Sequence, residues 1–120
     1  MIRILFVDDE PRVLDGLRRT LRPMRDKWEM SFVDCGKKAL ERLAEQSFDV
    51  LVTDMQMPEV DGRALLSAAS GKYPEMSRIV LSGQSSAEAE VRANGLAHSY
   101  LTKPCGMQDL TLVVDRLLPA

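Results

Sequence analysis

Three acidic side chains stand where short apolar runs of the sequence end. Asp8 and Asp9 follow the run Ile2–Val7, and Asp54 follows Val50–Val52 with one threonine between. Clustered carboxylates repel one another unless a cation offsets their charge, and carboxylate oxygens suit a hard divalent ion such as Mg²⁺. Mg²⁺ takes one or two such ligands together with waters and phosphate oxygens. The acids therefore indicate a metal-assisted phosphoryl site, in which an Asp could itself accept the phosphoryl group.

A hydroxyl and an amine follow two other apolar runs. Ser82 ends the run that begins at Arg78, and Lys103 follows Ser99–Thr102. The three acids carry a charge of −3, which Mg²⁺ would bring to −1 and Lys103 to about zero. Such a site could receive a phosphoryl group, because phosphoryl transfer depends on positioning and charge neutralisation. Two carboxylates could instead act on a sugar, but one Trp and two Tyr are few aromatic residues for a sugar cleft.

The elements that must position these residues alternate between two periodicities. Ile2–Val7 is an almost unbroken apolar run, which is typical of a strand buried on both faces of a parallel sheet. After Pro11, apolar residues recur at helical spacing until Pro23. The whole pattern predicts strands at 2–7, 28–33, 50–52, 78–82 and 99–102 and helices at 11–21, 37–46, 62–70, 87–93 and 109–118. This alternation predicts an α/β fold, a doubly wound parallel sheet of five strands with five helices.

Particular residues indicate how the elements begin and where they lie. Polar and apolar residues alternate in Trp28–Val33, which suits a strand at the edge of the sheet. Asp61 can cap the helix that begins at Gly62, and Asp9 or Glu10 alone could serve simply as a helix cap. Ligands of an open α/β sheet bind beyond the carboxyl ends of its strands. The three acids, the hydroxyl and the amine are therefore expected to converge at one edge.

The composition limits the classes of protein that fit. A length of 120 residues suits one domain over 1–120, and 16 Lys and Arg against 18 Asp and Glu give a net charge of −2. This balance offers no basic stripe for direct nucleic-acid binding. No stretch approaches the roughly 20 apolar residues of a membrane span, and the N-terminus lacks the pattern of a signal peptide, which favours a cytoplasmic location. Cys35 and Cys105 indicate neither a disulfide framework nor a zinc site.

Five short motifs resemble those of the receiver domain of two-component response regulators. In chain order they are Ile4–Pro11 (ILFVDDEP), Asp49–Pro58 (DVLVTDMQMP), Asp61-Gly62, Leu81-Ser82-Gly83 and Tyr100–Pro104 (YLTKP). Each lies at the carboxyl end of a predicted strand, and the resemblance extends over essentially the whole chain. The resemblance implies a flavodoxin-like receiver architecture with the strand order 2-1-3-4-5.

The resemblance also implies a role for each site residue. Asp54 would accept a phosphoryl group from a phosphohistidine on a sensor histidine kinase or a phosphotransfer protein. The carboxylates of Asp9 and Asp54, Asp8 through a water, and the backbone carbonyl of Gln56 would hold Mg²⁺ or Mn²⁺. Lys103 would pair with the phosphoryl oxygens.

Further residues are implied in switching and in the lifetime of the phosphorylated state. Ser82 would donate its hydroxyl to the phosphoryl group, and Tyr100 would rotate from an exposed toward a buried position. The face built from the fourth helix, the fifth strand and the last helix would then change, and a homodimer could form through it. Gln56 and Gln84 would influence how fast the aspartyl-phosphate is lost. Pro58, Gly62 and a cis Pro104 would have structural roles.

A phosphorylation-dependent signalling module, rather than an enzyme, is the leading hypothesis. One alternative is a Mg²⁺-dependent phosphohydrolase with an aspartyl nucleophile, which would need a second acid where Gln56 stands. Another is a scaffold with a receiver fold that is not phosphorylated. Cys105-Gly106 and Leu81–Ser85 resemble receivers joined to HD-type phosphodiesterase output domains, so such an output domain, in the same chain or separate, is an expected partner.

Overall fold

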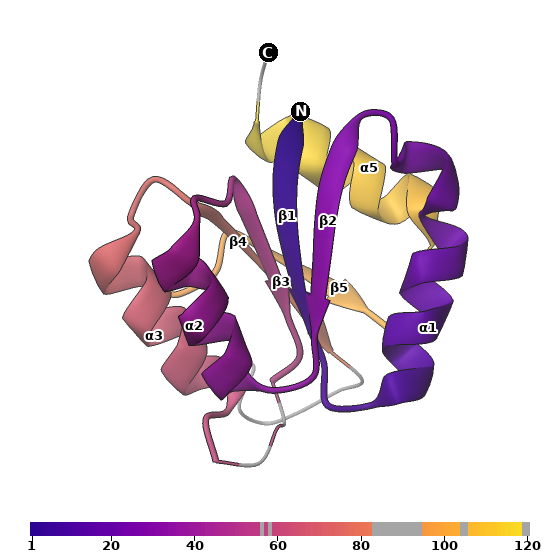
Figure 1. The fold of residues 1–120 in the computed structure, drawn as a ribbon. Coiled ribbons are helices and arrows are strands. Elements are labelled where there is room, and N and C mark those ends of the chain that lie inside the picture. The colour runs from indigo at the N-terminus through magenta and orange to yellow at the C-terminus, as the bar shows by residue number, and fades with distance from the viewer. Residues whose placement is uncertain (56, 58, 83–94, 104–105, 119–120) are drawn as a thin grey trace.

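The computed structural model describes residues 1–55, 57, 59–82, 95–103 and 106–118 (Figure 1). Its five strands form one parallel sheet in the order β2-β1-β3-β4-β5. The strands are β1 (Ile2–Val7), β2 (Trp28–Val33), β3 (Val50–Thr53), β4 (Ser77–Ser82) and β5 (Ser99–Thr102). The predicted parallel sheet, its strand order and the edge position of residues 28–33 are thus confirmed.

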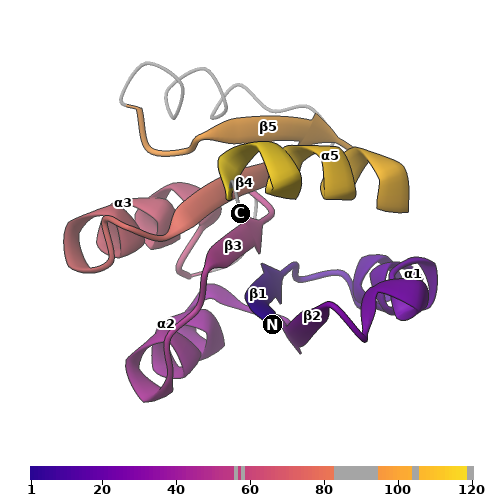
Figure 2. The ribbon, with the colours of Figure 1, turned by 90° about the horizontal axis from the view of Figure 1, so that it is seen from above.

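The part of the chain that the structure describes has four α-helices, which pack on the two faces of this sheet. They are α1 (Pro11–Thr20), α2 (Gly36–Glu45), α3 (Gly62–Lys72) and α5 (Met107–Leu117). Figure 2 shows α1 and α5 on one face and α2 and α3 on the other. The sequence predicted five helices, whereas the described residues contain four, because the helix expected at 87–93 falls within residues 83–94, outside the described part.

The core has two halves, one on each face of the sheet. In β1, Ile4 and Phe6 join the half beneath α1 and α5, whereas Leu5 and Val7 join the half beneath α2 and α3. All four side chains are at most 2% exposed. Successive side chains of a strand point to opposite faces, so a strand covered on both sides must be apolar at every position. This burial explains the apolar stretch Ile4–Val7 that ends at the acids.

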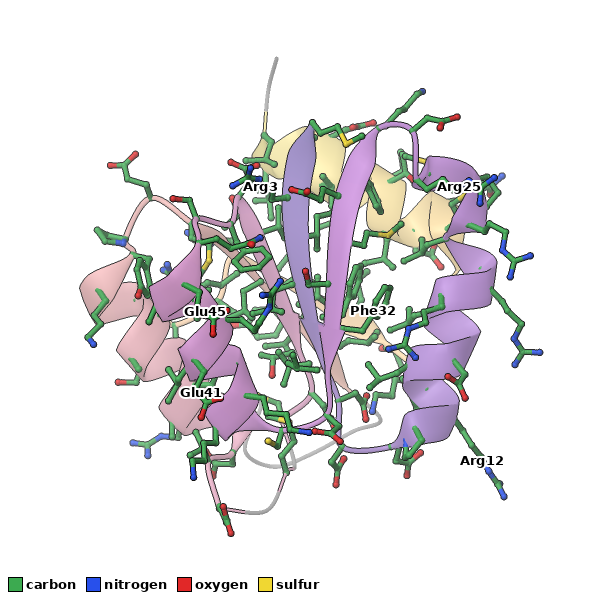
Figure 3. The ribbon with its side chains drawn as sticks, in the orientation of Figure 1. Arg3, Arg12, Arg25, Phe32, Glu41 and Glu45 are labelled. Carbon is green, nitrogen blue, oxygen red and sulfur yellow. The ribbon has the colours of Figure 1, made fainter. Side chains whose placement is uncertain are left out.

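The edge strand β2 is anchored by an aromatic contact rather than by burial on both faces. Phe32 stacks on Phe6 with ring centroids 4.9 Å apart, and the guanidinium of Arg18 lies 4.8 Å from the Phe32 centroid. Figure 3 shows Phe32 between β2 and α1. These contacts connect the last turn of α1, which carries Arg18, to the edge of the sheet.

The helix boundaries differ from the sequence expectation by one or two residues, as at α2, which spans Gly36–Glu45, and at α5, which begins at Met107. The first helix ends at Thr20, and Pro23 lies inside a 3₁₀ turn at Arg22–Met24 instead of marking the end of the α-helix. The third helix continues to Lys72 rather than Ser70. No helix within the described ranges is long and apolar enough to cross a membrane.

Candidate functional site

Asp8 and Asp54 lie together because the backbone hydrogen bonds between neighbouring strands continue one residue beyond the strand ends. The N–H of Asp8 donates to the carbonyl of Val33 at 3.2 Å, and the N–H of Asp54 donates to the carbonyl of Val7 at 3.0 Å. Asp8 and Asp54 are therefore held side by side, at 2% and 8% exposure, just beyond β1 and β3. Asp9 is exposed. One oxygen from each of the three carboxylates lies within 4.8 Å of the others.

Backbone amides fix one oxygen of each buried carboxylate. The N–H of Glu10 donates to Asp8 Oδ1 at 2.9 Å, and the N–H of Met55 donates to Asp54 Oδ1 at 2.8 Å. Such short local hydrogen bonds orient a carboxylate without another side chain. Glu10 precedes α1 without capping it through its side chain, so its contribution to the site comes from its backbone.

Lys103 joins the two buried carboxylates. Its Nζ lies 2.8 Å from Asp8 Oδ2 and 3.4 Å from Asp54 Oδ1. Asp8 Oδ2 is completely buried and makes no other polar contact with the described residues, so Lys103 is its counter-charge. The lysine reaches this position because β5 ends one residue earlier, at Thr102, on the same edge of the sheet.

The site retains an excess of negative charge. Among the described residues, three carboxylates face one ammonium, which gives this set a net charge of −2. Burial, together with the charge of Asp8, raises the pKa of Asp54, although Lys103 and the Met55 amide oppose the shift. Burial alone would lower the pKa of Lys103, but its contacts with Asp8 and Asp54 outweigh this and raise it. A set of oxygen donors with uncompensated negative charge fits a hard divalent cation such as Mg²⁺.

The remaining predicted site residues are placed less completely. The backbone of Ser82 lies opposite Thr102 in the β4–β5 pair, but its side chain is outside the described part. Tyr100 is half-buried in β5 and packs against the core beneath α2 and α3. Gly62 begins α3, and its N–H donates to the Met55 carbonyl at 3.0 Å. The predictions for Gln56, Pro58, Gln84 and Pro104 fall on residues outside the described part.

Two features of the site region have no counterpart in the sequence expectations. The amide of Met55 holds Asp54, and no side-chain pattern reveals a backbone donor. Glu59 adopts a φ of 65°, a left-handed conformation that favours glycine. A glutamate gives no signal for this conformation, although the Pro and Gly on either side of it indicate a turn.

A doubly wound parallel sheet with an acidic pocket and a lysine at the carboxyl ends of its strands defines a flavodoxin-like domain with a metal-compatible site. The chain belongs to the response regulator receiver domain family, whose model matches residues 4–115. It is 30% identical over 98% of its length to the uncharacterized transcriptional regulatory protein YesN of Bacillus subtilis, 33% of which it covers. The chain spans a third or less of the first three curated relatives it matches.

Two solved structures agree with this membership. The signal receiver domain of an HD domain-containing protein from Pseudomonas fluorescens Pf-5 matches with a TM-score of 0.87 and 29% identity, over 97% of this chain and 93% of that one. The response regulator protein TrrA of Thermotoga maritima, in complex with Mg(2+)-BeF, matches with a TM-score of 0.86 and 26% identity, over 98% and 100% of the two chains.

Proposed function

We propose that this receiver domain accepts a phosphoryl group on Asp54 from the phosphohistidine of a sensor histidine kinase or a phosphotransfer protein. The observation that carries the proposal is the placement of Lys103 between two buried carboxylates, with a third acid within 4.8 Å. Three acids and one lysine at the carboxyl edge of a parallel sheet fit a site that binds a divalent cation and a phosphoryl group. Membership of the receiver family supports the same chemistry.

The two oxygens of Asp54 differ in their contacts. The Met55 amide and the Lys103 ammonium both lie against Oδ1, and no described residue donates to Oδ2. We assign Oδ2 as the oxygen that attacks phosphorus, because it keeps its lone pairs available. The P–N bond to the donor histidine breaks as the P–O bond to Oδ2 forms. With the distal ring nitrogen of the phosphohistidine already protonated, the electron pair of the P–N bond stays on the other ring nitrogen and the histidine leaves as a neutral imidazole. Lys103 can then follow the new charge from Oδ1 to the phosphoryl oxygens.

Asp8, Asp9 and Asp54 would hold Mg²⁺, or Mn²⁺ in its place. The bound ion would offset carboxylate charge and attract the oxygens of the incoming phosphoryl group. The backbone carbonyl of residue 56, the remaining expected ligand, lies outside the described residues. Lys103 already neutralises part of the charge on Asp8, so the protein lowers the repulsion that an incoming phosphoryl group meets.

A partner has access to this edge beside α1. A groove of about 460 Å³ borders Lys103 and is lined mainly by one side of α1, with Glu10 and Leu81 completing it. The groove is open to solvent next to the residue that contacts Asp54, which supports transfer from the side chain of another protein. We infer that the domain is a regulatory phosphoacceptor rather than a turnover enzyme and that it works in the cytoplasm.

The consequence of phosphorylation is a switch in the surface around β5 and α5. We propose that Ser82 and Tyr100 respond to the phosphoryl group, because Ser82 ends the strand beside β5 and Tyr100 lies within β5. The relatives are described as a transcriptional regulatory protein and as an HD domain-containing protein. We therefore propose that this surface acts on an output domain, of the HD type by the motif resemblance, or on a second copy of the chain.

The experiment that tests the proposal is intact mass spectrometry after incubation with acetyl phosphate and Mg²⁺. We expect a mass gain of one phosphoryl group that requires Mg²⁺ and disappears in Asp54→Ala. Asp115→Ala, which removes an exposed carboxylate of α5, is the matched control and should label like the wild type. Equal labelling of Asp54→Ala would contradict the assignment. Donor consumption without an adduct would favour a phosphohydrolase, and no reaction at all would favour a scaffold.

A further inference from the structure

The first residue of α2 touches the loop that follows the phosphoacceptor. A Cβ added to Gly36 would lie 2.5 Å from the carbonyl oxygen of Val60 and 2.8 Å from Val60 Cβ and Cγ1. Carbon atoms do not approach one another or an oxygen so closely, so no residue with a side chain fits at position 36 without movement. The backbone of Gly36 is not left-handed, which means that glycine is needed here for space and not for its φ angle.

The same loop is held on its other side by the backbone of Asp54. A Cβ at Gly62 would clash with the Asp54 carbonyl oxygen and would lie 2.6 Å from Met55 Cα. The Gly62 N–H also donates to the Met55 carbonyl at 3.0 Å. Val60 stands only two residues before Gly62, so the stretch from Val60 to Gly62 is wedged between α2 and the Asp54–Met55 backbone.

The backbone from Val60 to Gly62 has little conformational freedom to accommodate a displacement. Glu59, which precedes Val60, already has a strained φ of 65°. Asp61 is fixed as the cap of α3, since its Oδ1 accepts from the Ala64 N–H at 2.9 Å. A displacement of Val60 is therefore expected to displace Gly62 and, with it, the backbone of Asp54 and Met55. The Met55 amide orients Oδ1 of Asp54, so the phosphoacceptor side chain would move as well.

We propose that Gly36 is a positioning residue for phosphoryl transfer: by lacking a side chain it lets Val60 seat against α2 and thereby sets the position of Asp54. The inference rests on the proposed phosphoacceptor function. Gly36 touches neither the phosphoryl donor nor the reacting oxygen and acts only through Val60 and Gly62. Displacements of about 1 Å in a reacting group can cost about a hundredfold in rate, and relief of the 2.5 Å contact needs movement of that order.

The test compares Gly36→Ala with Gly71→Ala, using acetyl phosphate and Mg²⁺ as probes. An added Cβ at Gly71, an exposed position of α3, meets nothing within 4 Å, so this variant makes the same chemical change without the contact. We expect the maximal labelling rate of folded Gly36→Ala to fall about ten- to a hundredfold, with an unchanged half-saturating donor concentration. Gly71→Ala should label at the wild-type rate. A purely structural role would change the folded fraction, measured by urea unfolding, and leave the rate of the folded protein unaltered.

A second variant keeps the test decisive if Gly36→Ala does not fold. Val60→Gly removes two of the three close atoms and releases the loop without adding any. We expect it to slow labelling by itself and to reduce the cost of Gly36→Ala in the double variant without abolishing it, because the contact with the Val60 carbonyl oxygen remains. Wild-type labelling of folded Gly36→Ala, or of Val60→Gly when the alanine variant is unfolded, would overturn the inference. An unlabelled wild type would instead reject the phosphoacceptor function itself.

Discussion

Replacement of Asp54 by Asn should stabilise the fold in the absence of divalent cations. The Asp54 side chain is 10% exposed and shares its pocket with Asp8 and Asp9, while Lys103 is its only basic contact among the described residues. Burial and the charge of Asp8 raise the pKa of Asp54, so the folded state holds the ionised carboxylate at a cost that the unfolded chain does not meet. Asn keeps the shape of the side chain and removes the charge.

The size of the effect follows from the distances. At an effective dielectric constant of about 20, two unit charges 4.8 Å apart interact by about 3.5 kcal/mol, and the Lys103–Asp54 contact at 3.4 Å contributes about 5 kcal/mol of attraction. Repulsion from Asp8 and Asp9 together exceeds this attraction, although solvent weakens the part from exposed Asp9. We expect a net gain of about 1 to 2 kcal/mol at pH 7 for Asp54→Asn, or about 4 °C in Tm for each kcal/mol.

The pH dependence has a defined sign. Some carboxyl groups have a higher pKa in the folded state than in the unfolded state. Such a group makes the fold more stable at low pH, where both states are protonated, than at high pH, where both are ionised. That contribution is complete below the ordinary pKa of 3.8 and is lost as the pH rises through the raised value. The difference between Asp54→Asn and the wild type should therefore be present at pH 7 and close as the pH falls toward 3.8.

Urea unfolding at a series of pH values, with a chelator present, measures this difference. Asp115→Asn is the matched control, because it changes the net charge equally at an exposed position of α5 and should shift stability by less than about 0.5 kcal/mol. Two results would refute the reasoning that repulsion between carboxylates destabilises the folded protein. One is a lower free energy of unfolding for Asp54→Asn than for the wild type at pH 7, and the other is an increase that stays constant down to pH 3.8.

Three further substitutions test other contacts of the site by urea unfolding. Lys103→Met should lower the free energy of unfolding by about 3 kcal/mol at pH 7, because it leaves buried Asp8 Oδ2 without a counter-charge; an unchanged value would mean that solvent already screens this oxygen. Gly62→Ala should lower the free energy of unfolding by about 2 kcal/mol or more, because the added Cβ would meet the backbone of Asp54. Gly71→Ala, the control, should raise the free energy of unfolding by up to about 1 kcal/mol through helix propensity. Equal effects of the two substitutions would contradict the close approach of Gly62 to Asp54. Glu59→Gly should stabilise by about 1 kcal/mol by relieving the left-handed backbone, and a loss would show that the glutamate side chain makes a compensating contact.

Much of the fold could be predicted because local and tertiary signals agree. The apolar run of β1 reports burial on both faces, the alternation in β2 reports an edge, and Asp61 stands where α3 needs a cap. The topological rule for parallel sheets then places the residues after each strand on one edge. For this reason, the types and positions of Asp8, Asp9, Asp54 and Lys103 were enough to predict that they converge, and in the structure they do.

The finer geometry depends on contacts between distant segments, which no local pattern encodes. Arg78 illustrates this, because a charged residue at the start of β4 is 5% exposed. Its guanidinium donates to the carbonyls of Leu96 and Met76 at 2.8 and 3.0 Å, and its backbone N–H donates to His98 Nδ1 at 2.9 Å. Burial and the charge of Arg78 lower the pKa of His98, which suits its role as an acceptor. The close contact of Gly36 with Val60 is hidden from the sequence in the same way.

The charge imbalance of the site connects its stability to its proposed chemistry. A second lysine would make the apo fold more stable, yet it would compete with a divalent cation for Asp8 and Asp54 and leave less attraction for it. With one lysine, the repulsion that remains between the carboxylates is relieved when a cation binds, so binding free energy is added to folding free energy. The rise in Tm produced by saturating Mg²⁺ should accordingly be larger for the wild type than for Asp54→Asn, which has lost both a ligand charge and part of the repulsion. The carboxylates that destabilise the folded protein in the absence of metal, Asp8, Asp9 and Asp54, are thus the same ones that would bind the metal and position the phosphoryl group.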